Sequence, residues 1–298
     1  MNTTNKIKNI AITGGTHGNE LTGVFLVKKW LLNPKLVERS NFKTVVMHTN
    51  KEAINQCRRY IDRDLNRAFS TKLLSSNSSS HYEDILAKEI NQKLGVKGAK
   101  ETNIDFIVDL HTTTSNMGLS IVVSNESEIT WRVIDYLSHK EPSLKIYRWK
   151  GDEEDAFVDS IAPHGFAIEV GAVPQGVLRA DLFLKTEQLV YHILDFFEAL
   201  NKQEIKNKYN EKLTIYDHVS LVDYPRDKEN ELIAMIHPNR QDRDFELIKK
   251  GDPLFLTLEG ETITYQKDEP LYGLFINEAA YYEKGFALCL AKKIEKKL

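Results

Sequence analysis

The fold is constrained most by a regular alternation of short apolar runs with amphipathic segments, which covers the first two-thirds of the chain. The apolar runs have the length of buried strands and lie at 8–13, 44–48, 104–110, 120–123, 145–149 and 166–170. Helical periodicity marks the segments 21–32, 81–94, 128–139 and 180–201. Strands that alternate with helices build a sheet with helices packed on it. The chain is therefore predicted to have an α/β fold.

The pattern changes near residue 205, where the segments become short, strand-like and separated by turn residues. These strand-like segments are 213–216, 232–236, 253–258, 262–265, 272–276 and 287–291. Short strands punctuated by turns are typical of a small β domain. We therefore expect an α/β domain at 1–205 and a smaller β-rich domain at 206–298, joined by a linker at 206–212. The serine-rich stretch 71–80 is predicted to be a surface loop.

Composition and charge exclude several classes of protein. The 298 residues are 41% apolar and 28% charged, which suits a globular protein with a hydrophobic core. A formal net charge of −3 provides no basic field for nucleic acid, and no apolar run approaches the ~18 residues of a membrane span. Cys57 and Cys289 lie far apart and are expected to be reduced thiols. We expect a cytoplasmic protein that binds neither nucleic acid nor a membrane.

The stretch 14–20, with the sequence GGTHGNE, lies between the first predicted strand and the first predicted helix. In open α/β sheets, ligands bind at such turns, at the carboxyl ends of strands. His17 and Glu20 are three residues apart, so at the entrance of a helix both side chains lie on one face. An imidazole and a carboxylate suit Zn²⁺, whose catalytic sites take three protein ligands and keep one position open. In an alternative interpretation, Glu20 only complements the dipole of the following helix.

His111 is the best candidate for a third ligand among the nine histidines. It follows the buried-strand pattern 104–110, so it also lies at the carboxyl end of a strand. Asp109, two residues earlier, could orient a metal-ligating histidine. His48 also ends a predicted strand and is the competing candidate. The alternative for His111 is a structural role, in which the side chain only caps its strand.

Glu169 interrupts the apolar strand pattern at 166–171. A carboxylate is costly to bury unless it is paired or used. Burial also raises the pKa of a carboxylate toward neutrality, as a general base requires. We interpret Glu169 as a candidate general base. The alternative is simple alternation, in which Glu169 lies on a solvated face of the sheet.

The segment 58–67 is unusually polar, with four arginines and two aspartates in ten residues. Its last two residues, Asn66 and Arg67, suit the fork-like recognition of a carboxylate. We therefore expect an anionic substrate. A solvated helix with local ion pairs is the alternative.

Together these motifs resemble those of the zinc carboxypeptidases, in the same order along the chain, and their detailed wording resembles the aspartoacylase family. Matching stretches lie at 14–23, 59–67, 174–181 and 277–282, where the chain reads GGTHGNELTG, RYIDRDLNR, PQGVLRAD and NEAAYY. The resemblance thus spans residues 14 to 282. It implies a zinc-carboxypeptidase-like mixed sheet flanked by helices, and a β-rich C-terminal domain that narrows access to a catalytic site in the first domain.

The resemblance also implies roles for the candidate residues. His17, Glu20 and His111 would hold one Zn²⁺ per chain, which activates a water molecule. Glu169 would take the proton of that water and pass a proton to the leaving amine.

Four further residues would act on the substrate, which the resemblance implies to be a small N-acyl amino acid. Arg59 and Glu169 would both act at the reacting amide, where Arg59 would stabilise the oxyanion. Asn66 and Arg67 would bind the α-carboxylate of the substrate. Tyr281, from the C-terminal domain, would donate a hydrogen bond to the substrate. The alternative for Tyr281 is an aromatic side chain packed on a strand.

The leading hypothesis is a zinc-dependent amidohydrolase that converts N-acetyl-L-aspartate and water to acetate and L-aspartate. One position departs from the aspartoacylase pattern, because Asp159 stands where those enzymes carry an arginine for the side-chain carboxylate. A short alignment slip, or a substitute cation such as Arg148 or Lys150, could restore the match to the aspartoacylase pattern. An aromatic or succinylated amino acid is the alternative to aspartate. A non-catalytic zinc protein and a peptide carboxypeptidase are the remaining alternatives. The oligomeric state stays open, a homo-oligomer included.

Overall fold

The structure, a computed structural model, describes residues 6–76, 78–151, 155–205 and 209–298. Its main feature is a ten-stranded sheet with the order β2-β1-β3-β6-β4-β5-β7-β13-β12-β9. Neighbouring strands from β2 to β6 run parallel, whereas β4 runs antiparallel to β6 and β13 antiparallel to β7. The strands are β1 (Asn9–Gly14), β2 (Lys43–His48), β3 (Phe106–Thr112), β4 (Gly118–Val123), β5 (Lys145–Arg148), β6 (His164–Gly171), β7 (Lys212–Val222), β9 (Leu247–Ile248), β12 (Leu271–Leu274) and β13 (Leu288–Lys297). The predicted α/β fold with a mixed sheet is confirmed.

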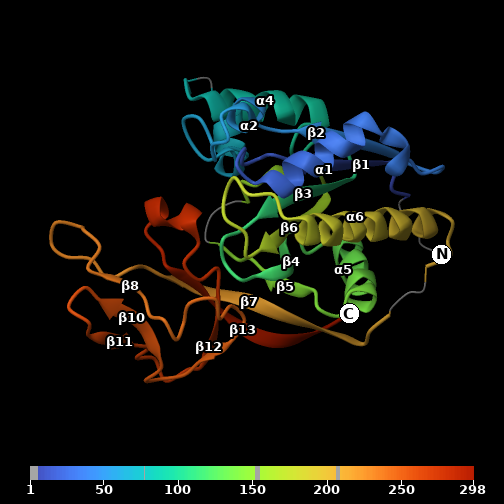
Figure 1. The fold of residues 1–298 in the computed structure, drawn as a ribbon. Helices are drawn as coiled ribbons and strands as arrows, with labels where there is room; N and C mark the ends of the chain where they lie inside the picture. The colour runs from blue at the N-terminus through green and yellow to red at the C-terminus, as the bar shows by residue number, and fades with distance from the viewer. Residues whose placement is uncertain (1–5, 77, 152–154, 206–208) are drawn as a thin grey trace.

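Helices cover both faces of the parallel part of this sheet (Figure 1). One face is covered by α1 (Leu21–Leu32), α5 (Glu128–Lys140) and α6 (Ala180–Asn201), and the other by α4 (Tyr82–Leu94). The shorter helices are α2 (Lys51–Asn55), α3 (Thr71–Ser75), and the 3₁₀ turns η1 (Pro34–Leu36), η2 (Leu65–Arg67), η3 (Val158–Ile161) and η4 (Ala279–Lys284).

Strand β1 shows why both faces need cover. Ile10 and Ile12 point into the larger core, under α1 and α6, while Ala11 points into the core under α4. Phe106 and Ile107 divide in the same way on the neighbouring strand β3. Continuous apolar runs are typical of parallel strands that are buried on both faces. The ends of these strands, and not their faces, are therefore free to carry chemistry.

The C-terminal part is rich in strands, as predicted, but it does not form a separate sheet throughout. Strands β7 and β13 pair over most of their length and continue the main sheet. A second, three-stranded sheet consists of β8 (Ala234–Ile236), β10 (Pro253–Thr257) and β11 (Thr262–Thr264). Figure 1 shows these three strands in orange, at the opposite end of the molecule from α5 and α6. The domain boundary at residue 205 stays a prediction.

Several local predictions differ from the structure. The serine-rich stretch 71–80 was predicted to be a loop, yet α3 forms there because the Ser70 side chain caps the Leu73 N–H. Of the predicted linker 206–212, residues 206–208 lie outside the described residues, and Lys212 already begins β7. The two-residue strand β9 escaped prediction because it is too short to show a pattern.

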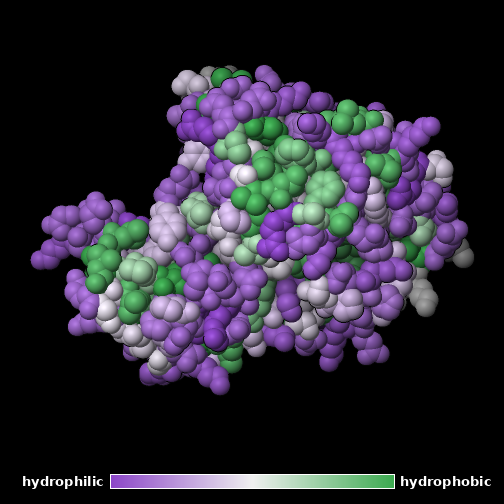
Figure 2. All heavy atoms as spheres, in the orientation of Figure 1, coloured by the Kyte–Doolittle hydropathy of each residue, from purple (hydrophilic) through white to green (hydrophobic). Residues whose placement is uncertain are grey.

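An apolar groove lies on the surface formed by α1 and the start of α6. Its lining includes Phe25, Leu32, Leu178 and Phe183, and Figure 2 shows hydrophobic side chains gathered over these two helices. Exposed apolar patches often mark contact surfaces. A homo-oligomer stays a prediction. Among the described residues, no helix is long and apolar enough to cross a membrane.

Phe106 tests the core under α6. Its ring is fully buried and lies against Phe166 and Phe197, with centroid distances of 5.3 and 4.9 Å. Phe106→Ala is expected to lower the free energy of unfolding by about 3–5 kcal/mol, because it removes these contacts and leaves a cavity. Urea denaturation measures this change. Leu184→Ala, at an exposed position of α6, serves as the control and is expected to change stability by less than about 0.5 kcal/mol. Equal effects of the two substitutions would contradict the assignment of the core.

Candidate active site

The carboxyl ends of β1 and β3 bring the three expected metal ligands together. His17 follows β1 in a turn, Glu20 directly precedes α1, and His111 lies near the end of β3. The His17 Nδ1 is 2.7 Å from Glu20 Oε1, and the His111 Nδ1 is 2.8 Å from Glu20 Oε2. One ligand atom from each residue lies within 4.8 Å of the other two. All three side chains are buried. His48, the competing candidate for the third ligand, does not belong to this cluster, and its Nε2 bonds the Val24 carbonyl.

His17 and Glu20 meet through a turn. The expectation that they share a helix face is wrong, because α1 begins only at Leu21 and the Glu20 N–H donates to the His17 carbonyl at 3.2 Å. The neighbouring helix α2 packs directly against this turn. A Cβ atom on Gly18 would lie 2.1 Å from the Ala53 carbonyl carbon, so only glycine fits there.

Two buried aspartates hold the outer nitrogens of the two imidazoles. The His17 Nε2 is 2.9 Å from Asp64 Oδ1, and the His111 Nε2 is 2.6 Å from Asp109 Oδ2. Imidazoles that donate Nε2–H to a carboxylate present an unprotonated Nδ1, which is the form that binds a metal. Thr13 and Thr16 in turn donate to Asp109 Oδ1. Both imidazoles therefore have a fixed orientation and aim Nδ1 at Glu20.

The donor set fits a zinc ion. Two ligands of tetrahedral zinc lie about 3.3 Å apart, given metal–ligand bonds of about 2.0 Å, and the closest ligand atoms here are 2.7, 2.8 and 3.2 Å apart. Burial alone would raise the pKa of Glu20, but His17 and His111 outweigh it and lower the pKa well below the usual range. Burial would lower the pKa of His111, but Asp109 and Glu20 raise it well above the usual value. These two shifts describe an ionised Glu20 paired with a protonated His111; a metal ion would take the place of the proton on the His111 Nδ1.

Glu169 lies beside His111 in the sheet, because the register of β3 and β6 pairs the two residues. Its neighbours Ile168 and Val170 point to the core under α6, so Glu169 points to the opposite side, into a pocket. Successive side chains of β6 therefore alternate between the two faces of the sheet, as the alternative for Glu169 assumed. The face that carries Glu169 lines this pocket. Burial raises the pKa of Glu169 to about 8; His111 opposes this shift, and Glu20 and Glu278 add to it. Within the part of the chain that the structure describes, its Oε2 atom has no hydrogen-bond partner.

The segment 58–67 forms an irregular loop that ends in η2, in place of a solvated helix. Arg59 donates to Glu20 Oε1 at 3.0 Å and approaches Asp64 Oδ2 at 3.4 Å. Asn66 accepts a hydrogen bond from the Val158 N–H; its amide nitrogen lies 3.4 Å from the His111 Nε2, and the residue lines the pocket. Arg67 lies over the Phe157 ring at 4.8 Å. Among the described residues, no carboxylate forms an ion pair with Arg67, so its guanidinium is available to an anion.

The C-terminal part supplies two residues to the pocket from η4. Tyr281 packs against Phe275 and Phe286, and burial raises the pKa of its hydroxyl well above the usual value. The Lys284 Nζ is 2.5 Å from Asp64 Oδ2. Burial lowers the pKa of Lys284 to about 8, although Asp64 opposes this shift.

Glu278 fixes the start of η4 to the loop that follows β3. Its buried carboxylate accepts hydrogen bonds from the Thr113 hydroxyl, and from the Thr114 N–H at 2.7 Å. This loop begins two residues after His111. The C-terminal part is therefore attached directly beside the candidate metal ligands.

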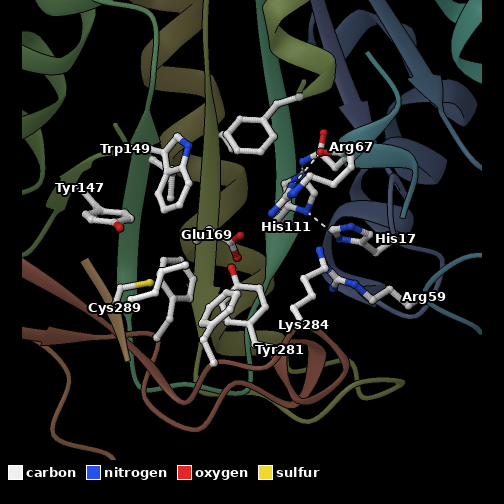
Figure 3. A pocket seen from close by; sticks show the side chains of 17 residues that line it. His17, Arg59, Arg67, His111, Tyr147, Trp149, Glu169, Tyr281, Lys284 and Cys289 are labelled. Atoms are coloured by element: carbon white, nitrogen blue, oxygen red, sulfur yellow. Dashed lines mark hydrogen bonds between the residues drawn. The ribbon is translucent and has the colours of Figure 1, made fainter. Parts of the chain in front are cut away.

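These residues line one pocket with a volume of about 220 Å³ and two chemically different sides. Figure 3 shows His17, His111 and Arg59 on one side, Trp149, Tyr147 and Cys289 on the other, and Glu169 between them. Outside the metal cluster, the polar side contains Arg59, Asn66, Arg67 and Lys284. The apolar side contains Val122, Tyr147, Trp149, Phe157, Leu221, Phe275, Tyr281, Phe286 and Cys289.

The residues that were expected to influence recognition of a side-chain carboxylate lie elsewhere. Asp159 is a buried residue of η3 and does not line the pocket. Arg148 makes a two-point contact with Asp217, at 2.7 and 2.8 Å, and Lys150 approaches the same carboxylate at 3.2 Å. Neither cation lines the pocket. The suggestion that one of them replaces the missing arginine is wrong.

Sequence reasoning missed several residues of the site. Asp64 was noted only as one charge in a polar segment, because nothing local shows that it reaches His17. Lys284 stands in an ordinary polar stretch, and its approach to Asp64 spans 220 residues. Trp149 and Tyr147 were assigned to a strand by their pattern, but periodicity does not reveal which face of a strand meets a pocket.

Comparisons with known proteins agree with this geometry. A family model described as the succinylglutamate desuccinylase/aspartoacylase catalytic domain matches residues 6–197, and another, described as the AstE/AspA barrel-sandwich hybrid domain, matches residues 211–293. A probable aspartoacylase of Trichodesmium erythraeum is 50% identical over 289 residues, which cover 97% of this chain and 98% of that protein.

Two mammalian relatives are also similar over nearly the whole chain. The human N-acyl-aromatic-L-amino acid amidohydrolase (carboxylate-forming) is 39% identical over 294 residues, which cover 96% of this chain and 91% of that protein. The crystal structure of murine aminoacylase 3 matches with a TM-score of 0.92 and 37% identity, and covers 99% of this chain and 98% of that chain. The chain therefore belongs to the succinylglutamate desuccinylase/aspartoacylase family.

Proposed function

We propose that this protein is a zinc-dependent amidohydrolase that splits N-acyl amino acids into a carboxylic acid and the free amino acid, with a preference for aromatic side chains. One observation carries the proposal: a His–Glu–His cluster and the carboxylate of Glu169 share one pocket with an aromatic wall and with Arg67, which pairs with no carboxylate among the described residues (Figure 3). A structural zinc site has four protein ligands and no substrate pocket, so a non-catalytic zinc protein is the weaker alternative.

His17, Glu20 and His111 would hold the zinc ion. Zinc, when bound, supplies a Lewis acid that lowers the pKa of water toward ~7 and polarises a carbonyl group. The chain supplies the rest. Asp64 and Asp109 keep the two imidazoles oriented, and His17 and His111 keep Glu20 ionised in spite of its burial.

Glu169 moves the proton in the proposed reaction. It accepts a proton from the attacking water, which then adds to the amide carbon, and it returns a proton to the amide nitrogen as the carbon–nitrogen bond breaks. Its raised pKa matches both tasks near neutral pH. Arg59, which lines the same pocket, donates to the carbonyl oxygen as negative charge develops on it.

The substrate is proposed to lie with its α-carboxylate at Arg67 and Asn66. A guanidinium binds a carboxylate at two points, and Arg67 has no such partner within the described residues. The remaining side chain then faces the wall formed by Trp149 and Tyr147. Tyr281 would donate a hydrogen bond from its hydroxyl, which burial keeps protonated.

N-acetyl-L-aspartate is the second candidate substrate, and Lys284 is the observation that favours it. This lysine lines the pocket and could meet a side-chain carboxylate, although it already pairs with Asp64. The name of the Trichodesmium relative points to aspartate, and that of the human relative points to aromatic amino acids. The aromatic wall and the absence of Arg148 and Lys150 from the lining favour the aromatic class.

Glu169→Gln tests the general base. The substitution is expected to lower kcat by at least ~10²-fold while the zinc content stays at the wild-type level. In the wild type, kcat/KM is expected to rise with pH, because only the ionised carboxylate accepts a proton. The midpoint of this rise should lie above the ordinary value of 4.5, because of burial, and no higher than about 8, because a bound dication favours the carboxylate. Rate–pH profiles check this; an active Glu169→Gln protein would refute the assignment.

Asp109→Asn tests the metal cluster. Loss of the carboxylate that orients His111 is expected to weaken zinc binding by about 10–100-fold, as measured by competition with a chromophoric chelator. Asp105→Asn serves as the control, because Asp105 binds the Lys8 and Asn9 N–H groups at the opposite end of the same strand. Chelation of the wild type is expected to abolish activity, and added zinc to restore it. Equal zinc affinity of the two variants would count against the cluster.

A panel of N-acetyl amino acids tests the substrate class. We expect kcat/KM for N-acetyl-L-phenylalanine to exceed that for N-acetyl-L-aspartate by more than about tenfold, since burial of an aromatic ring contributes about 1.5–3 kcal/mol. Trp149→Ala should reduce this ratio and leave kcat/KM for N-acetyl-L-alanine nearly unchanged. A higher kcat/KM for the aspartate derivative would instead make N-acetyl-L-aspartate the substrate.

A further inference from the structure

The loop between Arg59 and Asp64 is held by a residue that does not reach the pocket. Glu83, in the first turn of α4, has a fully buried side chain. Its Oε1 accepts the Ile61 N–H at 2.7 Å, and its Oε2 accepts the Asp62 and Arg63 N–H groups at 3.0 and 3.1 Å. Three successive backbone amides that point at one carboxylate form an anion-binding nest. In this protein the anion bound by the nest is the Glu83 carboxylate itself.

A fourth donor connects this carboxylate to the neighbourhood of the metal cluster. The Asn50 amide nitrogen donates to Glu83 Oε1 at 3.0 Å. The Asn50 N–H also bonds the Gly15 carbonyl, in the turn that leads to His17. The Glu83 carboxylate is thus bonded on both oxygens. It contacts the loop at 61–63 directly and is linked to the turn that leads to His17 through Asn50.

Side chains of this loop also form hydrogen bonds with α4. Asp62 accepts the Tyr82 N–H at 2.7 Å, which satisfies one of the free amides at the start of the helix. Asp84, next to Glu83, accepts from the Arg63 guanidinium at 3.1 Å. Of these contacts, only those of Glu83 fix the loop backbone at three consecutive residues. Glu83 therefore determines the path of the backbone between Arg59 and Asp64, the two functional residues of this loop.

We infer that Glu83 is a positioning residue for the reaction, which sets Arg59 and Asp64 through the backbone of residues 61–63. The inference rests on the proposed function for the role of Arg59, and on the zinc cluster for the role of Asp64. Arg59 leaves the chain two residues before the anchored stretch, and Asp64 follows it directly. A shift of this backbone moves the guanidinium at Glu20 and the carboxylate at the His17 Nε2 together.

Glu83→Gln tests the inference with little change of shape. The amide of glutamine keeps one acceptor and presents N–H donors to the amides that Oε2 now binds, so the loop must move. We expect kcat to fall at least tenfold and the zinc dissociation constant to rise at least tenfold in the full-length zinc-loaded protein. Glu83→Asp, which keeps the charge and withdraws the carboxylate by one methylene, is the milder variant and should show the same two losses in smaller measure, even if Glu83→Gln does not fold.

Asp135→Asn provides a matched control. Asp135 is a buried carboxylate on α5 that accepts the Tyr209 and Asn210 N–H groups at 2.8 and 3.0 Å, far from the pocket. Both substitutions replace one of two acceptor oxygens by an N–H donor, so both leave at least one backbone amide without its acceptor and should lower Tm. Only the Glu83 variants should lower kcat and zinc affinity. If Asp135→Asn and Glu83→Gln have the same kcat and zinc affinity, Glu83 is merely structural and the inference fails.

A double-mutant cycle separates positioning from general loosening. If Glu83 acts through Arg59, then Glu83→Gln should cost much less in kcat when Arg59 is already alanine; full additivity would overturn the inference. A wild type that hydrolyses no N-acyl amino acid would contradict the proposed function alone. The zinc measurement would then decide on Glu83, because a weaker affinity supports its action through Asp64 and an unchanged affinity refutes it.

Discussion

The structure depends on the burial of two imidazoles against one carboxylate. His17, Glu20 and His111 are all almost inaccessible to solvent, and groups of this kind are costly to bury unless each has partners. Asp64 and Asp109 supply the partners on the outer side, which leaves the inner atoms directed at a common point. The strand order makes this possible, since β1 and β3 are adjacent parallel strands and end side by side. Buried faces on both sides of these strands leave the turns at their carboxyl ends as the place for chemistry.

The second requirement is that the pocket has contributions from distant parts of the chain. The first two-thirds provide the cluster and Glu169, while η4 brings Tyr281 and Lys284 from the C-terminal strands. Glu278 fixes the position of η4 relative to the metal cluster, because its carboxylate is bonded to the loop that follows His111. The continuous sheet through β7 and β13 holds the two parts together. Docking of the C-terminal part is therefore part of building the site and does more than restrict access to it.

The sequence was sufficient for the features that have a local signal. The alternation of strands and helices, the change near residue 205 and the apolar strand around Glu169 follow from periodicity, and the turn with His17 and Glu20 follows from its glycines and its place between a strand and a helix. Contacts that join distant residues were not predictable, because periodicity carries no information on which faces meet. Asp64 and Lys284 belong to this class, as does the fate of Arg148, whose partner Asp217 lies on another strand.

The irregular segment 58–67 shows why such a site needs support from outside itself. Arg59, Asp64, Asn66 and Arg67 contact different groups around the pocket, and a regular helix would place residues only one or two positions apart on different faces. A chain that abandons helix or sheet also leaves its backbone amides without partners, and buried amides of this kind are costly. Glu83 resolves both problems, because its carboxylate bonds three of these amides while it fixes their direction. The freedom of the loop to carry four functional side chains thus follows from one buried acid on a neighbouring helix.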